Sequence, residues 1–307
     1  ELIESVIIGI PLPLIYLAES QKGDLVVVDG RQRLTTFVKF LNNEFRLNGL
    51  RILKEINGYG FSDLEKDKRY SKYATNIEDF QLVVQVIKYP TPDKVRFDIF
   101  DRVNRGGTPL NKQEMRNALY QGQSTQMLQE LSEGEAFLAA TGRSISPKHM
   151  KDRYIILRAL CFDLYQKKKL TDAEGKNVEY RSDIEDFLGT GMEFLNRMPP
   201  TELCELKEEF ERTMWHIYHI IGDNAFRIPT EYERRRPISM TLFEALYYLF
   251  QQFVKVDNED IRKLQDIVKE LLEDQEFLKS LQFSVDSKNH VDIRFHKVME
   301  KYQEKFL

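Results

Sequence analysis

Residues 29–33, Asp-Gly-Arg-Gln-Arg, place a carboxylate, a glycine and two guanidinium groups in one short stretch. Four apolar residues, Leu25 to Val28, precede it and predict a short buried strand. The residues after it predict a helix, because apolar side chains recur there at the helical period: Leu34, Phe37, Val38 and Leu41. The stretch is therefore expected to be a tight turn between a strand and the start of a helix.

Two arginines at the start of a helix act against the helix dipole, which favours acidic groups at that end. An anion between Arg31 and Arg33 would remove the conflict, since unpaired N–H groups, guanidinium forks and Gly30 are together typical of a phosphate site. The alternative is that Asp29 caps the helix and both arginines are solvated. From this turn alone the two interpretations are equally good.

A second informative stretch is residues 104–110, Asn-Arg-Gly-Gly-Thr-Pro-Leu, between predicted helices at 93–103 and 112–120. Asn111, followed three residues later by Glu114, fits a capping box at the start of the second helix. Two consecutive glycines relax the backbone between the helices.

Asp101 and Asn104 lie on the same face at the end of the first of these helices. One interpretation is a helix–loop–helix corner with Asn104 as the C-terminal cap. The other is a loop that closes over a ligand at residues 29–33, with Asp101 and Asn104 as oxygen ligands of Mg²⁺.

Composition predicts a folded, soluble protein, because 42% of the 307 residues are hydrophobic and 31% are charged. No apolar run approaches the roughly 18 residues of a membrane helix, so no membrane partner is expected. The formal net charge of −4 argues against a general nucleic-acid binder. DNA contact would have to be local, at Lys167–Lys169 or Arg234–Arg236, although such runs are usually solvated. Cys161 and Cys204 are expected to be buried thiols of a cytoplasmic protein.

The periodicities predict an α+β fold with a mixed front part and a helical remainder. Strands are expected at residues 14–18, 25–28 and 80–89. From about residue 148 helices dominate, and they are predicted at residues 151–168, 183–196, 201–221, 238–255, 258–272 and 291–305.

The two stretches together resemble a known family. Asp-Gly-Arg-Gln-Arg at 29–33, followed by Phe-Asp-Arg-Val-Asn-Arg-Gly-Gly-Thr-Pro-Leu-Asn-Lys-Gln-Glu at 100–114, is similar to the ParB/sulfiredoxin-like N-terminal domain of GmrSD-type type IV restriction enzymes. The usual motifs of that family are Asp-Gly-Gln-Gln-Arg and Phe-x-Arg-x-Asn-x-Gly-Gly-x-x-Leu-x-x-x-Glu. The resemblance implies a small ParB/sulfiredoxin-like mixed-sheet domain at 1–122, followed by an α-helical domain at 123–307. It also implies an upstream Gln-Arg-x-Tyr/Phe-x-Trp segment, which this sequence does not contain.

The resemblance implies binding of a nucleoside triphosphate with Mg²⁺, and its hydrolysis, in defence against phage. Combined with the residue chemistry, it gives Asp29 as the catalytic group. The phosphate ligands would be Gly30, Arg31, Gln32, Arg33, Arg105, Gly106 and Gly107. The metal ligands would be Asn104, Asp101 and Glu114.

Departures from the family leave an alternative open. Arg31 stands where the family usually has glutamine. Val103 and Gly107 replace the glutamate and arginine that flank the corresponding asparagine in ParB proteins. No nuclease or P-loop motif is present, and His216 with His219 is expected to be helix packing rather than a metal site. The alternative is therefore a non-catalytic nucleotide-gated or DNA-binding module that partners a separately encoded nuclease.

Overall fold

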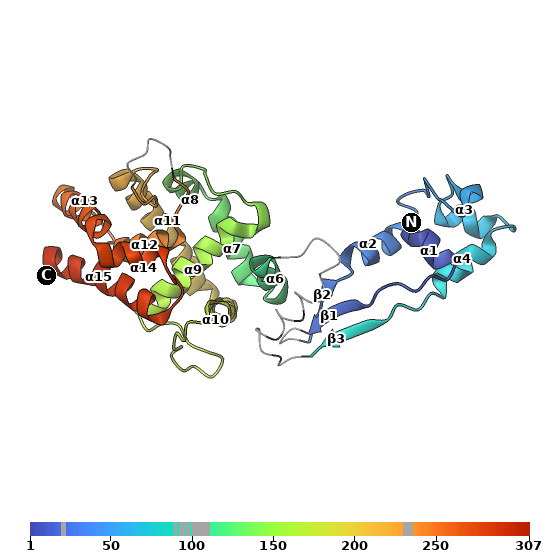
Figure 1. Cartoon of the computed structure of the whole chain (residues 1–307), viewed down its shortest axis with the longest axis horizontal. Helices are drawn as coiled ribbons and strands as arrows, with labels where there is room; N and C mark the ends of the chain where they lie inside the picture. The colour runs from blue at the N-terminus through green and yellow to red at the C-terminus, as the bar shows by residue number, and fades with distance from the viewer. Residues whose placement is uncertain (20–22, 89–90, 92–94, 96–98, 100–110, 230–235) are drawn as a thin grey trace. The chain divides into compact units, whose positions relative to one another are not determined.

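The structure, a computed structural model, describes the chain except for residues 20–22, 89–90, 92–94, 96–98, 100–110 and 230–235 (Figure 1). The chain divides into two compact units, Glu1–Pro109 and Leu110–Leu307. The boundary expected at residue 122 stays a prediction, because the extent of a compact unit and the extent of a family's sequence pattern are different quantities.

A small mixed sheet lies in the first unit. Among the described residues it has three strands in the order β2-β1-β3, with β1 at Ile15–Glu19, β2 at Leu25–Asp29 and β3 at Val84–Ile87. β1 pairs antiparallel with β2 and parallel with β3. The β1–β2 register shifts between Tyr16 and Leu17, which is a local irregularity next to the predicted turn. The strands expected near residues 14–18 and 25–28 are confirmed, but the expectation that the second is buried is wrong, since Val28 alone of its four apolar residues is buried.

β3 is shorter than the sequence predicts. One long strand was expected over residues 80–89, but among the described residues of this range the strand comprises Val84–Ile87. Phe80 and Leu82 instead pack against the helical core of the first unit. Their apolar character therefore serves a packing contact and not a strand face.

That core is formed with these described elements: α1 Leu2–Ile7, α2 Arg31–Leu41, the 3-10 turn η1 Lys54–Ile56, α3 Phe61–Lys66 and α4 Ser71–Glu78. Glu4 is buried, and its carboxylate accepts hydrogen bonds from the backbone N–H groups of Ile52 (2.7 Å) and Leu53 (2.9 Å). These bonds, the one from Leu53 first, hold the pKa of Glu4 below its ordinary value. A buried carboxylate thus fixes the loop that follows residue 50.

The second unit is helical, as the sequence predicts, and the class is α+β as expected. Its α-helices are α6 Lys112–Leu119, α7 Gln123–Glu133, α8 Glu135–Ala140, α9 Lys151–Gln166, α10 Ile184–Arg197, α11 Pro200–Ile221, α12 Met240–Phe250, α13 Asn258–Glu273, α14 Gln275–Gln282 and α15 Lys288–Phe306. A 3-10 turn, η3 Lys148–Met150, precedes α9. Within the parts of the chain that the structure describes, no helix has the length and apolar character to span a membrane.

α12 lies at the centre of the second unit, with all residues after Met240 buried. The aromatic side chains of Tyr247, Tyr248, Phe250 and Phe253 all belong to the core. The expectation for the cysteines is half wrong: Cys161 is buried on α9, but Cys204 is exposed on α11, and both are free thiols.

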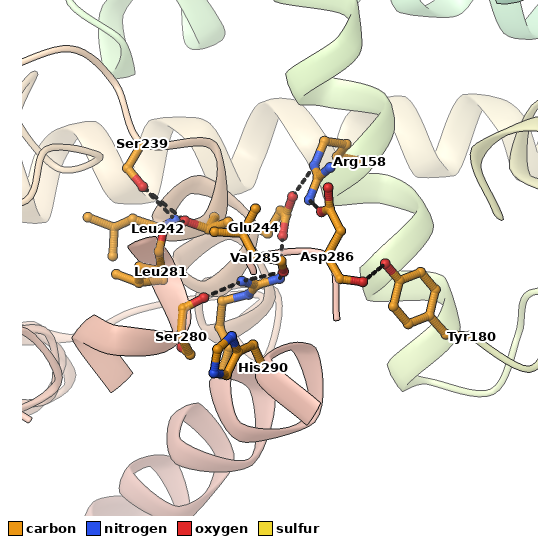
Figure 2. Close-up of polar contacts among 12 residues, drawn as sticks. Arg158, Tyr180, Ser239, Leu242, Glu244, Ser280, Leu281, Val285, Asp286 and His290 are labelled. Atoms are coloured by element: carbon orange, nitrogen blue, oxygen red, sulfur yellow. Dashed lines mark hydrogen bonds and ion pairs between the residues drawn. The ribbon is translucent and has the colours of Figure 1, made fainter. Parts of the chain in front are cut away.

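A buried ionic network joins three helices of this core (Figure 2). One oxygen of Glu244 on α12 accepts from Nε of Arg158 on α9, and the other accepts from Nη2 of Arg294 on α15 at 3.0 Å. Arg158 also reaches Asp286, whose backbone carbonyl accepts from the Tyr180 hydroxyl at 2.6 Å. Two buried guanidinium groups are thus balanced by two carboxylates, which is the condition for keeping such charges inside a protein.

Candidate phosphate-binding turn

The turn between β2 and α2 requires glycine. Gly30 has φ of 95°, in the left-handed region, and is the N-cap residue of α2. It is buried, and a Cβ atom built there would lie 3.0 Å from Cγ1 of Ile15 and 3.3 Å from its Cγ2. Any other residue would be strained by the backbone angle and crowded by β1. The glycine therefore lets the chain turn directly from the sheet into the helix.

The start of α2 has no side-chain cap. Asp29 does not cap it, which contradicts the alternative interpretation of the turn, because the N-cap position belongs to Gly30. The first N–H groups of an α-helix have no partner within the helix, and here no side chain at the N-cap position satisfies them. This end of α2 is thus suited to an acceptor supplied from outside, such as an anion.

Arg33 is held inward. Its Nη2 lies 2.6 Å from Oδ2 of Asp29 and donates to the carbonyl of Leu14 at 3.2 Å, while Nη1 donates to the carbonyl of Pro13. Only 19% of the Arg33 side chain and 29% of the Asp29 side chain are exposed. Arg33 therefore neutralises Asp29 and fastens the segment before β1 to the turn. The sequence could not predict the two carbonyl partners of Arg33, because every residue has a backbone carbonyl whatever its side chain.

Arg31 and Gln32 are exposed at the start of the helix. In the described parts of the chain, the Arg31 side chain has no hydrogen bond and no ion pair. Of the two arginines in the turn, Arg31 is thus the one whose guanidinium is available to a ligand.

The second stretch is described only from Asn111 onward. Asp101, Asn104, Arg105, Gly106 and Gly107 lie outside the described residues, so their predicted roles stay predictions. The capping box is confirmed: Oδ1 of Asn111 accepts from the N–H groups of Gln113 and Glu114, and Oε2 of Glu114 accepts from the N–H of Asn111 at 2.7 Å.

The other oxygen of Glu114 lies 3.2 Å from Nδ1 of His149, and the carbonyl of His149 accepts from Nδ2 of Asn111 at 2.6 Å. His149 has φ of 61° and the next residue, Met150, has φ of 54°. Both carboxylate oxygens of Glu114 are therefore engaged within the second unit. The sequence did not point to His149, because its partner is 35 residues away along the chain.

Other candidate groups give no metal centre. Among the described residues, no three His, Cys, Asp or Glu side chains are grouped so as to hold a metal ion. His219 stacks on Trp215, with ring centroids 5.6 Å apart, on α11. The partial burial of His216 lowers the pKa of its imidazole. Packing within the helix is what the sequence predicted for this pair.

The basic runs are only partly available for DNA. Nζ of Lys167 pairs with Oδ2 of Asp163 at 2.8 Å, while Lys168 and Lys169 are exposed. Arg236 is exposed, and Arg234 and Arg235 lie outside the described residues. Of the four basic side chains of these runs that the structure describes, Lys167 is thus committed to an internal pair.

The family match described next covers the first unit and the whole of α6. Residues 1–121 match the family model described as GmrSD restriction endonuclease, N-terminal domain. No curated protein matches the chain. No solved structure matches it either. The first 121 residues therefore carry the sequence pattern of the GmrSD N-terminal domain, which confirms the resemblance that the two motifs indicated.

Proposed function

We propose that the strand–turn–helix unit of residues 25–41 binds the phosphates of a nucleoside triphosphate, in a restriction or anti-phage system. The observation that carries the proposal is the start of α2, which follows directly on Gly30 and has no side-chain cap, together with the exposed side chain of Arg31, which forms no ion pair with any described residue. Helix N-termini with an adjacent arginine favour phosphate oxygens through both the dipole and the bidentate fork. The biological context follows from the family description, which names a restriction endonuclease.

Mg²⁺ would arrive with the nucleotide. The described residues fit poorly as a resident metal site, because Asp29 shares one oxygen with Arg33 and both oxygens of Glu114 are engaged. Phosphate oxygens and water supply most ligands of Mg²⁺ in nucleotide complexes. Asp29 would add at most one ligand through Oδ1, and the roles of Asp101 and Asn104 remain predictions of the sequence.

Hydrolysis is the finer form of the proposal, with Asp29 orienting the attacking water. A specific observation favours a second candidate, binding without turnover. Arg33 pairs with Oδ2 of Asp29 at 2.6 Å, so one oxygen of the carboxylate is already engaged and is less available to orient a water molecule. In that case the nucleotide would act as a switch ligand for a partner such as a separately encoded nuclease or DNA.

The test is isothermal titration of the full chain with ATP, GTP, CTP and UTP in the presence of Mg²⁺, followed by phosphate release on the nucleotide that binds. Binding with phosphate release that falls at least tenfold in Asp29→Asn supports hydrolysis. Binding without release above background assigns the switch role. Failure of all four nucleotides to bind would overturn the proposal.

A further inference from the structure

α11 has an outward face whose composition is unusual for a soluble helix. Its inner side is in the core, through residues such as Phe210, Met214 and Ile217. The outer side carries the acidic–aromatic stripe, defined as Glu208, Glu211, Trp215, Tyr218 and His219, all of them exposed. These positions recur at three- and four-residue steps and so lie along one side of the helix.

The aromatic end of the stripe is ordered. Trp215, the only tryptophan of the chain, stacks on His219 with an interplanar angle of 20° and meets Tyr218 edge-on at 5.9 Å. Trp215 and Tyr218 each remain 37% exposed. A tryptophan fixed by two ring neighbours and still open to solvent presents a ready stacking surface at low entropic cost.

The acidic end of the stripe lacks counterions. Within the described parts of the chain, neither Glu208 nor Glu211 forms an ion pair, and Glu208 accepts only a weak S–H bond from Cys204 at 3.8 Å. Some surface carboxylates elsewhere in this unit are paired, and Glu270 takes both Lys301 and Lys305. Neither of these two carboxylates is therefore neutralised by an ion pair among the described residues.

From this combination we infer that the acidic–aromatic stripe is a docking site for an arginine-bearing polypeptide segment of a partner protein. A guanidinium stacks on the indole of Trp215, and neighbouring arginines meet Glu208 and Glu211. The indole is the strongest aromatic acceptor of a cation, and the planar guanidinium can stack on it while still donating to a carboxylate. The charge of the stripe selects against nucleic acid, because the same carboxylates repel phosphates.

The single tryptophan makes the test direct. The full chain is titrated at low salt with a synthetic helical peptide that carries one arginine per turn, and Trp215 fluorescence is recorded. The inference predicts a saturable change, absent with the same peptide in which citrulline replaces arginine. It also predicts that Glu208→Gln with Glu211→Gln weakens binding about tenfold.

The matched control is Glu65→Gln with Glu78→Gln, which changes the net charge equally through two exposed glutamates of the first unit. This control should bind the peptide as the parent chain does. If both double variants bound the peptide equally weakly, net charge alone would explain the effect, and the inference would be overturned. It would also be overturned if the peptide left the fluorescence unchanged or if single-stranded oligothymidylate produced the saturable change instead.

Discussion

Arg33 matches the family's sequence motif, yet its side chain binds other groups of the protein. The side chain bridges Asp29 and the backbone carbonyls of Pro13 and Leu14. It therefore connects the segment before β1 to the turn that follows β2. A ligand that bound to Arg33 would have to break these bonds. Arg31 makes no such bonds to the described residues, so it can bind a ligand without that cost.

Because Arg33 holds the segment before β1 against the turn, its replacement should lower the stability of the first unit. Arg33→Ala should lower the free energy of unfolding of the first unit by about 2 kcal/mol, because it leaves a half-buried carboxylate and two carbonyls without their donor. Urea denaturation measures the effect. Arg31→Ala, the control in the same turn, should stay within about 0.5 kcal/mol of the parent. Equal stability of the two variants would contradict this stabilising role of Arg33.

Asp163 predicts a pH dependence in the second unit. Burial raises the pKa of its carboxyl to about 6, despite the ion pair with Lys167. The folded state then holds the proton more tightly than the unfolded state, so the contribution is favourable below the unfolded pKa of about 4 and is lost as the pH rises toward 6. Asp163→Asn should flatten this decline in stability between pH 4 and pH 6, which denaturation at a series of pH values would measure. A decline of the same steepness in the variant would assign it to other groups.

At the scale of elements, α9 and α10 approach unusually closely at Gly191. A Cβ atom on Gly191 would lie 2.2 Å from Sγ of Cys161, but 3.6 Å from its Cβ. Gly191→Ala should therefore destabilise the second unit by about 1–3 kcal/mol through overpacking. Adding Cys161→Ala removes the clashing sulfur and should restore most of the loss. Thermal denaturation of the single and double variants measures both effects, and additive losses would contradict the proposed contact.

The elements also show what the sequence could predict. The strand, turn and helix at residues 25–41 were predictable because each has a strong local signal, and so was the buried aromatic helix α12. The buried face of α2 was predicted wrongly: Val38 and Leu41 are exposed, and Phe40 is buried with Phe37. The pair Val38 and Leu41 and the pair Phe37 and Phe40 both fit the helical period. Only the position of the surrounding core decides which pair is buried.

The site was less predictable for a similar reason. The capping box at Asn111 and Glu114 is local, and the sequence indicated it correctly. The contacts of Glu114 with His149 and of Arg33 with Pro13 join residues far apart along the chain. No periodicity or spacing reports such contacts, so the sequence assigned both residues to a ligand. These ligand roles stay predictions.

At the scale of the whole molecule, each unit has its own core, and this predicts two unfolding steps. Glu244→Gln should remove the charge between Arg158 and Arg294 and destabilise the second unit by about 3–5 kcal/mol. The first unit should keep its transition temperature. Calorimetry of the full chain measures both, and a single transition that moves as one would contradict independent units.

We propose above that the turn at residues 29–33 binds nucleotide phosphates through Arg31 and the start of α2. The most direct measurement is the thermal unfolding of the full chain with each nucleoside triphosphate and Mg²⁺, for the parent, Arg31→Ala and Lys39→Ala. Lys39 is an exposed cation in the last turn of the same helix, so it matches the charge change away from the turn. Binding to the native state raises the melting temperature. We expect at least one nucleotide to raise the melting temperature of the parent and of Lys39→Ala but not that of Arg31→Ala. An equal rise in all three proteins would place the nucleotide elsewhere and contradict the claim.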